Sequence, residues 1–263
     1  MQAGVSTASL FLRETNEDAL VALNKIDAKV VEIFLESFCE YTDDFANLLK
    51  SRLNNLKVHS VHTLNTHFEP ELFSLNDRAY QDAHKTFLNV LSVAKILDAK
   101  NYTFHGQIRL KRNAKAFTNY AYTGGVFDKL SREAKEFGVN LCLENVEWAI
   151  YSPAGYFSQI KPYAKQLSTC LDIKQARLAG FDYKDYLAEM QGTLKTVHIS
   201  DYDADGKILL PGKGIFDFKK LISDLNDAKY DGPLIIEVYK DSFKDLEEVG
   251  ESLEYIRKLI KEG

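Results

Sequence analysis

The sequence of 263 residues contains only three cysteines, Cys39, Cys142 and Cys170, and none of them forms a CxxC pair. An odd number of widely spaced cysteines argues against a disulfide framework and for reduced thiols. A basic leader is also missing, and no apolar run approaches the roughly 18 residues that cross a membrane. We therefore expect a cytoplasmic protein with no membrane partner.

The sequence has no excess of basic residues. It contains 33 lysines and arginines against 38 acidic residues, which gives a net charge of -5. Nucleic-acid-binding proteins usually carry a basic balance or a basic stripe, so we expect no nucleic-acid partner. Hydrophobic residues make up 45% and charged residues 27%, as in an ordinary globular protein with a sizeable core.

A short apolar strand that ends on a polar residue is the recurring feature of the chain. The segment LCLENVE, residues 141–147, alternates apolar residues and stops at Glu144. Because side chains alternate across a strand, Glu144 should point to the same interior side as Cys142. Similar segments end at His62, His105, Asp172, His198 and Glu237. Residues two positions before these ends should line a barrel one layer down: Ser60, Thr103, Cys142, Cys170, Thr196 and Ile235.

The spacing of these strand ends predicts the fold. Successive ends are 43, 39, 28, 26 and 39 residues apart, and each interval accommodates one strand, one loop and one helix. This is the size of a βα unit in a barrel of roughly 250 residues. We therefore predict an α/β fold, a (β/α)8 TIM barrel with a parallel, closed, eight-stranded sheet. A doubly wound open sheet is the alternative, although its edge strands have less reason to end in polar residues.

Strands and helices alternate along the chain, and no linker or change of composition marks a second domain. We expect a single TIM-barrel domain over residues 1–263. The first strand is predicted at residues 5–12, and the longest helical pattern covers residues 76–97. His59 has the opposite parity to His62 and is expected to be structural.

Four polar strand ends come from consecutive strands: Glu144, Asp172, His198 and Glu237. Singly, each acid is better explained as a loop residue or a hydrogen-bonded strand terminus. In a barrel the four would surround one cavity, where three carboxylates repel one another unless a cation compensates. Three oxygen donors and one imidazole suit one divalent metal ion, with Mn²⁺ or Mg²⁺ favoured and Zn²⁺ or Co²⁺ as alternatives.

The motifs SVH, FHG, LEN, LDIKQ, VHISD, PGKG and IIEVY follow one another from residue 60 onward. In this order they resemble the xylose isomerase-like TIM-barrel superfamily, the sugar phosphate isomerase/epimerase group, which also includes endonuclease IV and inosose dehydratase. The resemblance implies that Glu144, Asp172, His198 and Glu237 bind the metal. It also implies that His62 and His105 face the same pocket.

The sequence departs from the family pattern in three places. Many members carry Asp-x-x-His on strand six, whereas here Gln175 stands three residues after Asp172, and an amide is a poor metal ligand. The multi-metal nucleases place an Asp and a His where this chain has Gly206 and Ile208. The epimerases often carry an Arg where this chain has Ala204. The missing ligands count against a nuclease.

Candidates for substrate binding lie at the strand ends or in the loops that follow: His62, His105, Gln175, Phe68, Trp148, Arg109 and Lys213. Imidazoles suit substrate contact and proton transfer near neutral pH, and a lysine beside glycine amides suits a phosphate. Most of these have a structural alternative. The histidines could be hydrogen-bonded barrel residues, the aromatic residues loop anchors, the arginine a solvated side chain and the lysine part of a tight turn.

We therefore predict a metal-dependent isomerase or epimerase of a small sugar, polyol or sugar phosphate. Glu144 and Glu237 would be the catalytic pair that moves a proton through an enediolate, and the resemblance implies the same pair. An inosose-type dehydratase is the main alternative, because it needs the same metal and base. An endonuclease IV-like nuclease and a non-catalytic ligand-binding barrel are weaker alternatives. The sequence leaves open the substrate, its phosphorylation, the metal and the oligomeric state.

Overall fold

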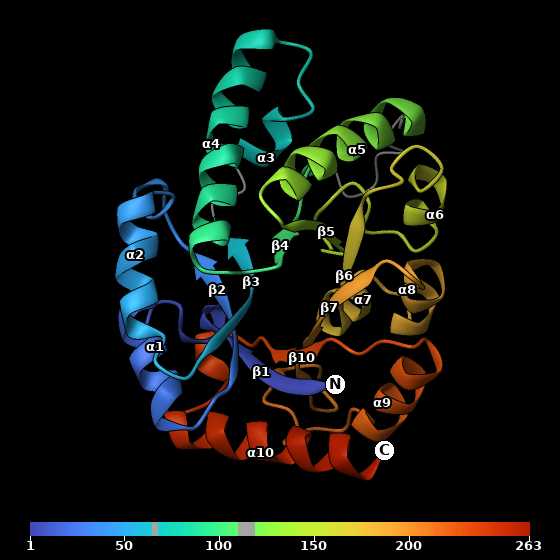
Figure 1. Cartoon of the computed structure of the whole chain (residues 1–263). Helices are drawn as coiled ribbons and strands as arrows, with labels where there is room; N and C mark the ends of the chain where they lie inside the picture. The colour runs from blue at the N-terminus through green and yellow to red at the C-terminus, as the bar shows by residue number, and fades with distance from the viewer. Residues whose placement is uncertain (65–67, 110–118) are drawn as a thin grey trace.

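Eight apolar segments pair side by side and close into a parallel barrel in the computed structural model, which describes residues 1–64, 68–109 and 119–263 (Figure 1). The barrel strands are β1 (Gln2–Ser6), β2 (Val30–Leu35), β3 (Lys57–Thr63), β4 (Asn101–Phe104), β5 (Asn140–Glu144), β6 (Ser168–Asp172), β7 (Leu194–Ile199) and β10 (Pro233–Ile236). The ring closes because β1 pairs in parallel with both β2 and β10. The predicted TIM barrel is therefore confirmed. A separate antiparallel pair, β8 (Asp201–Tyr202) and β9 (Ile208–Leu209), follows β7.

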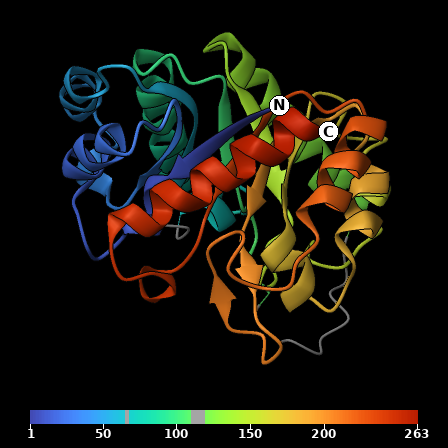
Figure 2. The same cartoon turned by 90° about the horizontal axis from the view of Figure 1, so that it is seen from below.

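Helices lie between the strands and surround the barrel (Figure 1). They are α1 (Asn16–Lys25), α2 (Asp43–Arg52), α3 (Phe68–Glu71), α4 (Asp77–Ile96), α5 (Tyr120–Glu136), α6 (Tyr156–Ile160), α7 (Ile173–Leu178), α8 (Tyr183–Met190), α9 (Phe218–Asp227) and α10 (Leu246–Glu262). Short 3-10 helices cover Thr7–Leu10, Phe38–Glu40 and Lys240–Ser242. Helix α10 packs on the outside of the barrel against β1 (Figure 2). None of the described helices is long and apolar enough to cross a membrane.

The long helix α4 shows why these segments pack as they do. Phe87, Val90, Leu91 and Ala94 recur at helical spacing and are fully buried. The helix begins where the side chain of Asn76 accepts a hydrogen bond from a backbone N–H of its first turn. Its predicted range, residues 76–97, differs from the observed one by a single residue at each end.

The first strand is shorter than predicted. It ends at Ser6 instead of continuing to residue 12, and a 3-10 helix follows it. The side chain of Ser6 accepts a hydrogen bond from the N–H of Ala8, which starts that helix. Thr7 Oγ1 donates to Asn16 Oδ1 and accepts from the backbone N–H of Phe34. These hydroxyl groups satisfy backbone and side-chain partners that a continuing strand would not reach.

The layer below the strand ends is filled as the alternation predicted, because Ser60, Thr103, Cys142, Cys170, Thr196 and Ile235 all have no exposed surface. His59 departs from the parity rule. The register between β2 and β3 shifts next to it, and its Nε2 lies 3.0 Å from Thr196 Oγ1. Since β3 and β7 are not neighbours in the ring, this contact crosses the barrel interior. The side chain of His59 therefore points into the barrel at the bulge and is half-buried.

Candidate functional site

Four neighbouring strands of the ring, β5, β6, β7 and β10, carry a cluster of polar residues at their ends. We call Glu144, Asp172, His198 and Glu237 the acidic cluster. Glu144 and Asp172 are the last residues of β5 and β6, His198 lies one residue before the end of β7, and Glu237 follows β10 directly. One ligand atom from each of the four lies within 4.8 Å of all the others. All four side chains are buried. The barrel therefore brings together the complete set that the strand ends predicted.

The imidazole of His198 lies among the three acids. Its Nδ1 is 3.0 Å from Glu144 Oε1, 3.2 Å from Glu237 Oε2 and 4.0 Å from Asp172 Oδ2. The other ring nitrogen, Nε2, is 3.0 Å from a carboxylate oxygen of Glu32. When Nε2 donates its proton to Glu32, Nδ1 is the ring nitrogen that faces the acids. This is the arrangement in which a carboxylate orients a metal-binding histidine.

Each of the three acids has one oxygen in use and one without a hydrogen-bond donor among the described residues. Asp172 Oδ1 accepts from the N–H of Gln175 and so caps α7, whereas Oδ2 has no donor. Glu144 Oε2 and Glu237 Oε2 are buried and also lack one. Buried carboxylate oxygens are normally hydrogen-bonded or bound to a metal. Three buried carboxylates and an imidazole, each able to offer one ligand atom within 4.8 Å of the others, fit a divalent cation.

The pKa shifts in the cluster follow from burial and from neighbouring charges. Burial would raise the pKa of Glu237, but the charges of His198 and Lys174 hold it well below its ordinary value. The pKa of Asp172 is raised to about 6, because burial and the nearby acids outweigh Lys174. Burial would lower the pKa of His198, yet the groups around it raise that pKa well above the usual value. Without a cation, the cluster therefore retains protons.

Glu32, in the middle of β2, is a central residue of the site that the sequence interpretation missed. It has no exposed surface and accepts hydrogen bonds from Ser60 Oγ at 2.7 Å and Thr103 Oγ1 at 2.8 Å, besides its contact with His198. Burial would raise its pKa, but His198 and His62 hold it well below the ordinary value. A charged residue between Val31 and Ile33 was the signal in the sequence.

Lys174 is a second residue that the sequence interpretation missed. Its Nζ is 3.3 Å from Glu237 Oε1 and 3.5 Å from Asp172 Oδ2, and 3% of its side chain is exposed. Burial would lower its pKa, but Asp172 and Glu237 raise it. A lysine in the first turn of a helix is normally solvated, so no local pattern marked it.

His62 and His105 lie beside the acidic cluster, and their Nε2 atoms are 2.7 Å apart. Both Nε2 atoms approach Glu144 Oε2, at 3.7 Å from His62 and 3.5 Å from His105. Burial would lower the pKa of His62, but contacts with Glu237 and Glu32 raise it to about 10. The two histidines therefore share the interior site with the predicted metal ligands.

The backbone at His105 is held by Glu69, another buried acid that the sequence interpretation missed. Its Oε2 accepts from the backbone N–H groups of His105 and Gly106, both at 2.8 Å. Its Oε1 accepts from Tyr102 Oη at 2.9 Å. Gly106 has φ +72°, and a Cβ there would overlap Tyr151, so this position requires glycine. The hydrogen bonds of Glu69 and the glycine at position 106 therefore fix the backbone conformation at His105.

Comparison with known proteins identifies the family. A family model described as xylose isomerase-like TIM barrel matches residues 20–259, nearly the whole chain. The chain belongs to this family. The resemblance carried by the strand-end motifs is therefore confirmed. No curated protein matches the chain significantly.

Solved structures of similar proteins share the same barrel. A D-tagatose 3-epimerase-like protein has 18% identity and a TM-score of 0.78, over 100% of this chain and 99% of that chain. D-psicose 3-epimerase from Clostridium cellulolyticum H10, with D-tagatose, has 15% identity and a TM-score of 0.77, over 99% of both chains. The IolI protein with a bound zinc atom has 15% identity and a TM-score of 0.78, over 100% of this chain and 99% of that chain. At such identities the similarity establishes the fold alone.

Three more of the predicted substrate-binding residues, Trp148, Gln175 and Arg109, lie near the acidic cluster and contact His105 or the backbone of Glu147. The ring of Trp148 lies 5.2 Å from that of His105. Gln175 Oε1 accepts a hydrogen bond from the backbone N–H of Glu147 at 3.0 Å. Arg109 donates to the backbone carbonyl of Glu147 at 3.0 Å. The segments after β4, β5 and β6 are therefore joined to one another beside His105.

The two remaining candidates, Phe68 and Lys213, contact residues outside the acidic cluster. Phe68 has 5% of its surface exposed, and its ring lies 6.0 Å from that of Tyr41, so it packs as a core residue. Lys213 forms an ion pair of 2.8 Å with Glu251 of α10. Its ammonium group therefore faces the outer helix layer. Lys111 and Arg112, the basic residues that follow Arg109 in the sequence, lie outside the described residues.

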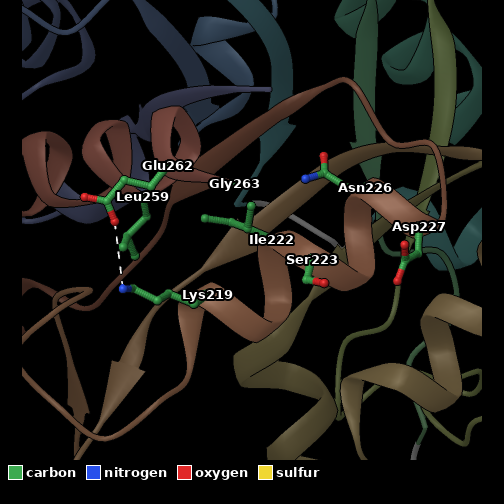
Figure 3. A pocket seen from close by; sticks show the side chains of 8 residues that line it. All are labelled: Lys219, Ile222, Ser223, Asn226, Asp227, Leu259, Glu262 and Gly263. Carbon is green, nitrogen blue, oxygen red and sulfur yellow. Dashed lines mark ion pairs between the residues drawn. The ribbon is translucent and has the colours of Figure 1, made fainter.

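A cavity of about 510 Å³ lies between α9 and the end of α10, on the outside of the barrel (Figure 3). Its lining includes Ile222, Asn226 and Leu259, and an ion pair of 3.8 Å joins Lys219 to Glu262 at its edge. None of the candidate site residues lines it. This cavity is therefore separate from the cluster at the strand ends.

Proposed function

We propose that the protein is a metal-dependent isomerase or epimerase of a small sugar, polyol or sugar phosphate. The observation that carries the proposal is the set of three buried carboxylates and one imidazole at the ends of β5, β6, β7 and β10, which can each offer one ligand atom within 4.8 Å of the others. Solved structures with the same fold include proteins described as D-tagatose 3-epimerase-like and D-psicose 3-epimerase. These descriptions support a carbohydrate as the substrate.

Glu144, Asp172, His198 and Glu237 would hold one divalent ion, with Mn²⁺ or Mg²⁺ favoured and Zn²⁺ or Co²⁺ as alternatives. When bound, such an ion supplies Lewis acidity, which polarises a substrate carbonyl and acidifies the neighbouring C–H bond. Glu32, 3.0 Å from His198 Nε2, would orient the ring so that Nδ1 faces this ion. The zinc atom in the IolI structure is consistent with a metal in this fold.

Glu144 and Glu237 would move the proton. They come from β5 and β10, which are separated in the ring by β6 and β7, so they approach the centre from different sides. One glutamate would remove the proton from the carbon next to the carbonyl, and the other would return a proton from the opposite side of the resulting enediolate. Positioned acid–base groups of this kind typically contribute about 10²- to 10⁴-fold in rate.

The substrate would be oriented by the residues around the histidine pair. His62 and His105 adjoin Glu144 Oε2, and both rings suit hydrogen bonds to substrate hydroxyls. Trp148 lies against His105 and would supply an apolar wall for a sugar face. Gln175 and Arg109, both bonded to the backbone of Glu147, would mark the outer edge of the site.

Hydrogen exchange with solvent tests this function. A panel of ketoses, inososes and their phosphates, supplied with Mn²⁺ in D₂O, should reveal a substrate that gains deuterium next to its carbonyl. Glu144→Gln and Glu237→Gln should each suppress the exchange, whereas Glu262→Gln, on the outer helix α10, should not. Turnover without deuterium incorporation would contradict the proton-transfer mechanism. Undiminished exchange in both glutamine variants would remove the two glutamates from it, and loss of water from an inosose would identify a dehydratase.

A further inference from the structure

Lys174 is an unusual residue for the interior of a barrel. It lies in the first turn of α7, two residues after Asp172, and only 4% of its surface is exposed. Among the lysines and arginines of the described residues it alone is fully buried. Lysine is almost never buried without an ionic partner, because removing an ammonium group from water is costly. Its position therefore needs a compensating negative charge.

The compensating charges come from the predicted metal ligands themselves. Nζ of Lys174 lies 3.3 Å from Glu237 Oε1 and 3.5 Å from Asp172 Oδ2. Within the described ranges, the other ion-pair partners of these two acids are histidines. The face of the Tyr239 ring lies 4.9 Å from the same ammonium group, a favourable arrangement for a cation. Lys174 is thus the permanent cation of the acidic cluster.

We propose that Lys174 is a built-in cation of the metal site, which holds the ligand acids together in the metal-free protein and lowers their affinity for a divalent ion. The inference rests on the metal site of the proposed function. When ionised, Glu144, Asp172 and Glu237 carry three negative charges, and Lys174 reduces the sum to two. A divalent ion then neutralises the set without an excess of either sign. The metal would bind reversibly, and the empty site would keep its shape.

The lysine also determines which oxygen of Glu237 faces the other ligands. It contacts Oε1, whereas Oε2 lies 3.2 Å from Nδ1 of His198 and accepts no hydrogen bond from a described residue. Oε2 of Glu237 can therefore bind a cation while Oε1 remains paired with Lys174. Without Lys174, both oxygens of Glu237 would be available, and the repulsion between the ammonium group and a divalent ion would be lost.

Lys174→Met tests the proposal, with Lys219→Met on the exposed outer face as the matched control. Calorimetry with Mn²⁺ on chelator-treated protein should show at least about tenfold tighter binding in Lys174→Met, because the repulsion between a unit and a double charge a few ångströms apart is worth that much even with the screening of bulk water. Thermal unfolding in chelator should occur at a lower temperature in the same variant. Saturating Mn²⁺ should reduce that difference. The Lys219→Met variant should match the wild type in both measurements.

Unchanged or weaker Mn²⁺ binding in a folded Lys174→Met protein would overturn the proposal, and so would an unchanged melting temperature in chelator. If the single variant does not fold, Lys174→Met combined with Glu237→Gln removes both members of the pair and should recover part of the lost stability. Failure to recover any of it would also overturn the proposal. A wild-type protein that binds no Mn²⁺ would contradict the proposed function instead. The melting comparison would then still decide whether Lys174 stabilises the acids.

Discussion

Replacing Glu32 by glutamine should weaken metal binding while the barrel remains folded. The carboxylate of Glu32 accepts the proton of His198 Nε2 and thereby directs Nδ1 toward the ligand acids. Glutamine keeps the shape of the side chain but removes the negative charge that makes the imidazole a stronger ligand. The hydroxyl groups of Ser60 and Thr103, which donate to Glu32, can turn and accept from the new amide. The substitution should therefore reduce the affinity for the metal more than the stability of the barrel.

The magnitude follows from the position of Glu32. Partners that orient a metal-binding histidine are typically worth about 10- to 100-fold in metal affinity. This corresponds to roughly 1.4 to 2.7 kcal/mol in binding free energy. Glu32 has no exposed surface, and water cannot replace its charge beside His198. We therefore expect a loss near 100-fold, at the upper end of this range.

Titration calorimetry with Mn²⁺ on chelator-treated protein near neutral pH measures the effect. Ser60→Ala is the matched control, because it removes one donor to Glu32 and leaves the contact between Glu32 and His198 in place. Its metal affinity should stay within a few-fold of the wild type. Wild-type affinity in a folded Glu32→Gln protein would refute the reasoning. Equal weakening in both variants would attribute the effect to packing.

Two further predictions concern protons and the segment after β7. The raised pKa of His198 means that the metal-free ring retains a proton near neutral pH, so Mn²⁺ binding should release protons and strengthen as the pH rises. Calorimetry in buffers of different ionisation enthalpy measures this proton release. A binding heat that does not depend on the buffer would contradict the prediction. Asp201→Ala should lower the free energy of unfolding by roughly 3 kcal/mol, because the buried carboxylate accepts from the backbone N–H groups of Tyr202, Gly212, Gly214 and Phe216. Urea denaturation measures the loss, Asp201→Asn should recover part of it, and a change below about 1 kcal/mol would contradict the assignment.

The local pattern of the sequence was sufficient for the barrel and for the four polar strand-end residues that lie together in it. Strand alternation placed Glu144 on the same side as Cys142, and the regular spacing of the strand ends required one helix per interval. Such patterns are readable because a buried strand must be apolar and because carboxyl ends of parallel strands meet at one rim. The first strand was the exception, since its end at Ser6 depends on hydrogen bonds made by side chains of the following turn.

The tertiary structure decided which charges meet in the interior and which candidates are engaged elsewhere. Glu32 reaches His198 across the ring, from β2 to β7, and no spacing along the chain encodes that contact. Lys174 is buried only because β6 and β10 place two carboxylates beside it, whereas Lys213 is drawn to Glu251 on the outer helix. The physical reason is the same in each case. A charge has its lowest energy beside its partner, and the partner's position is set by residues far away in the sequence.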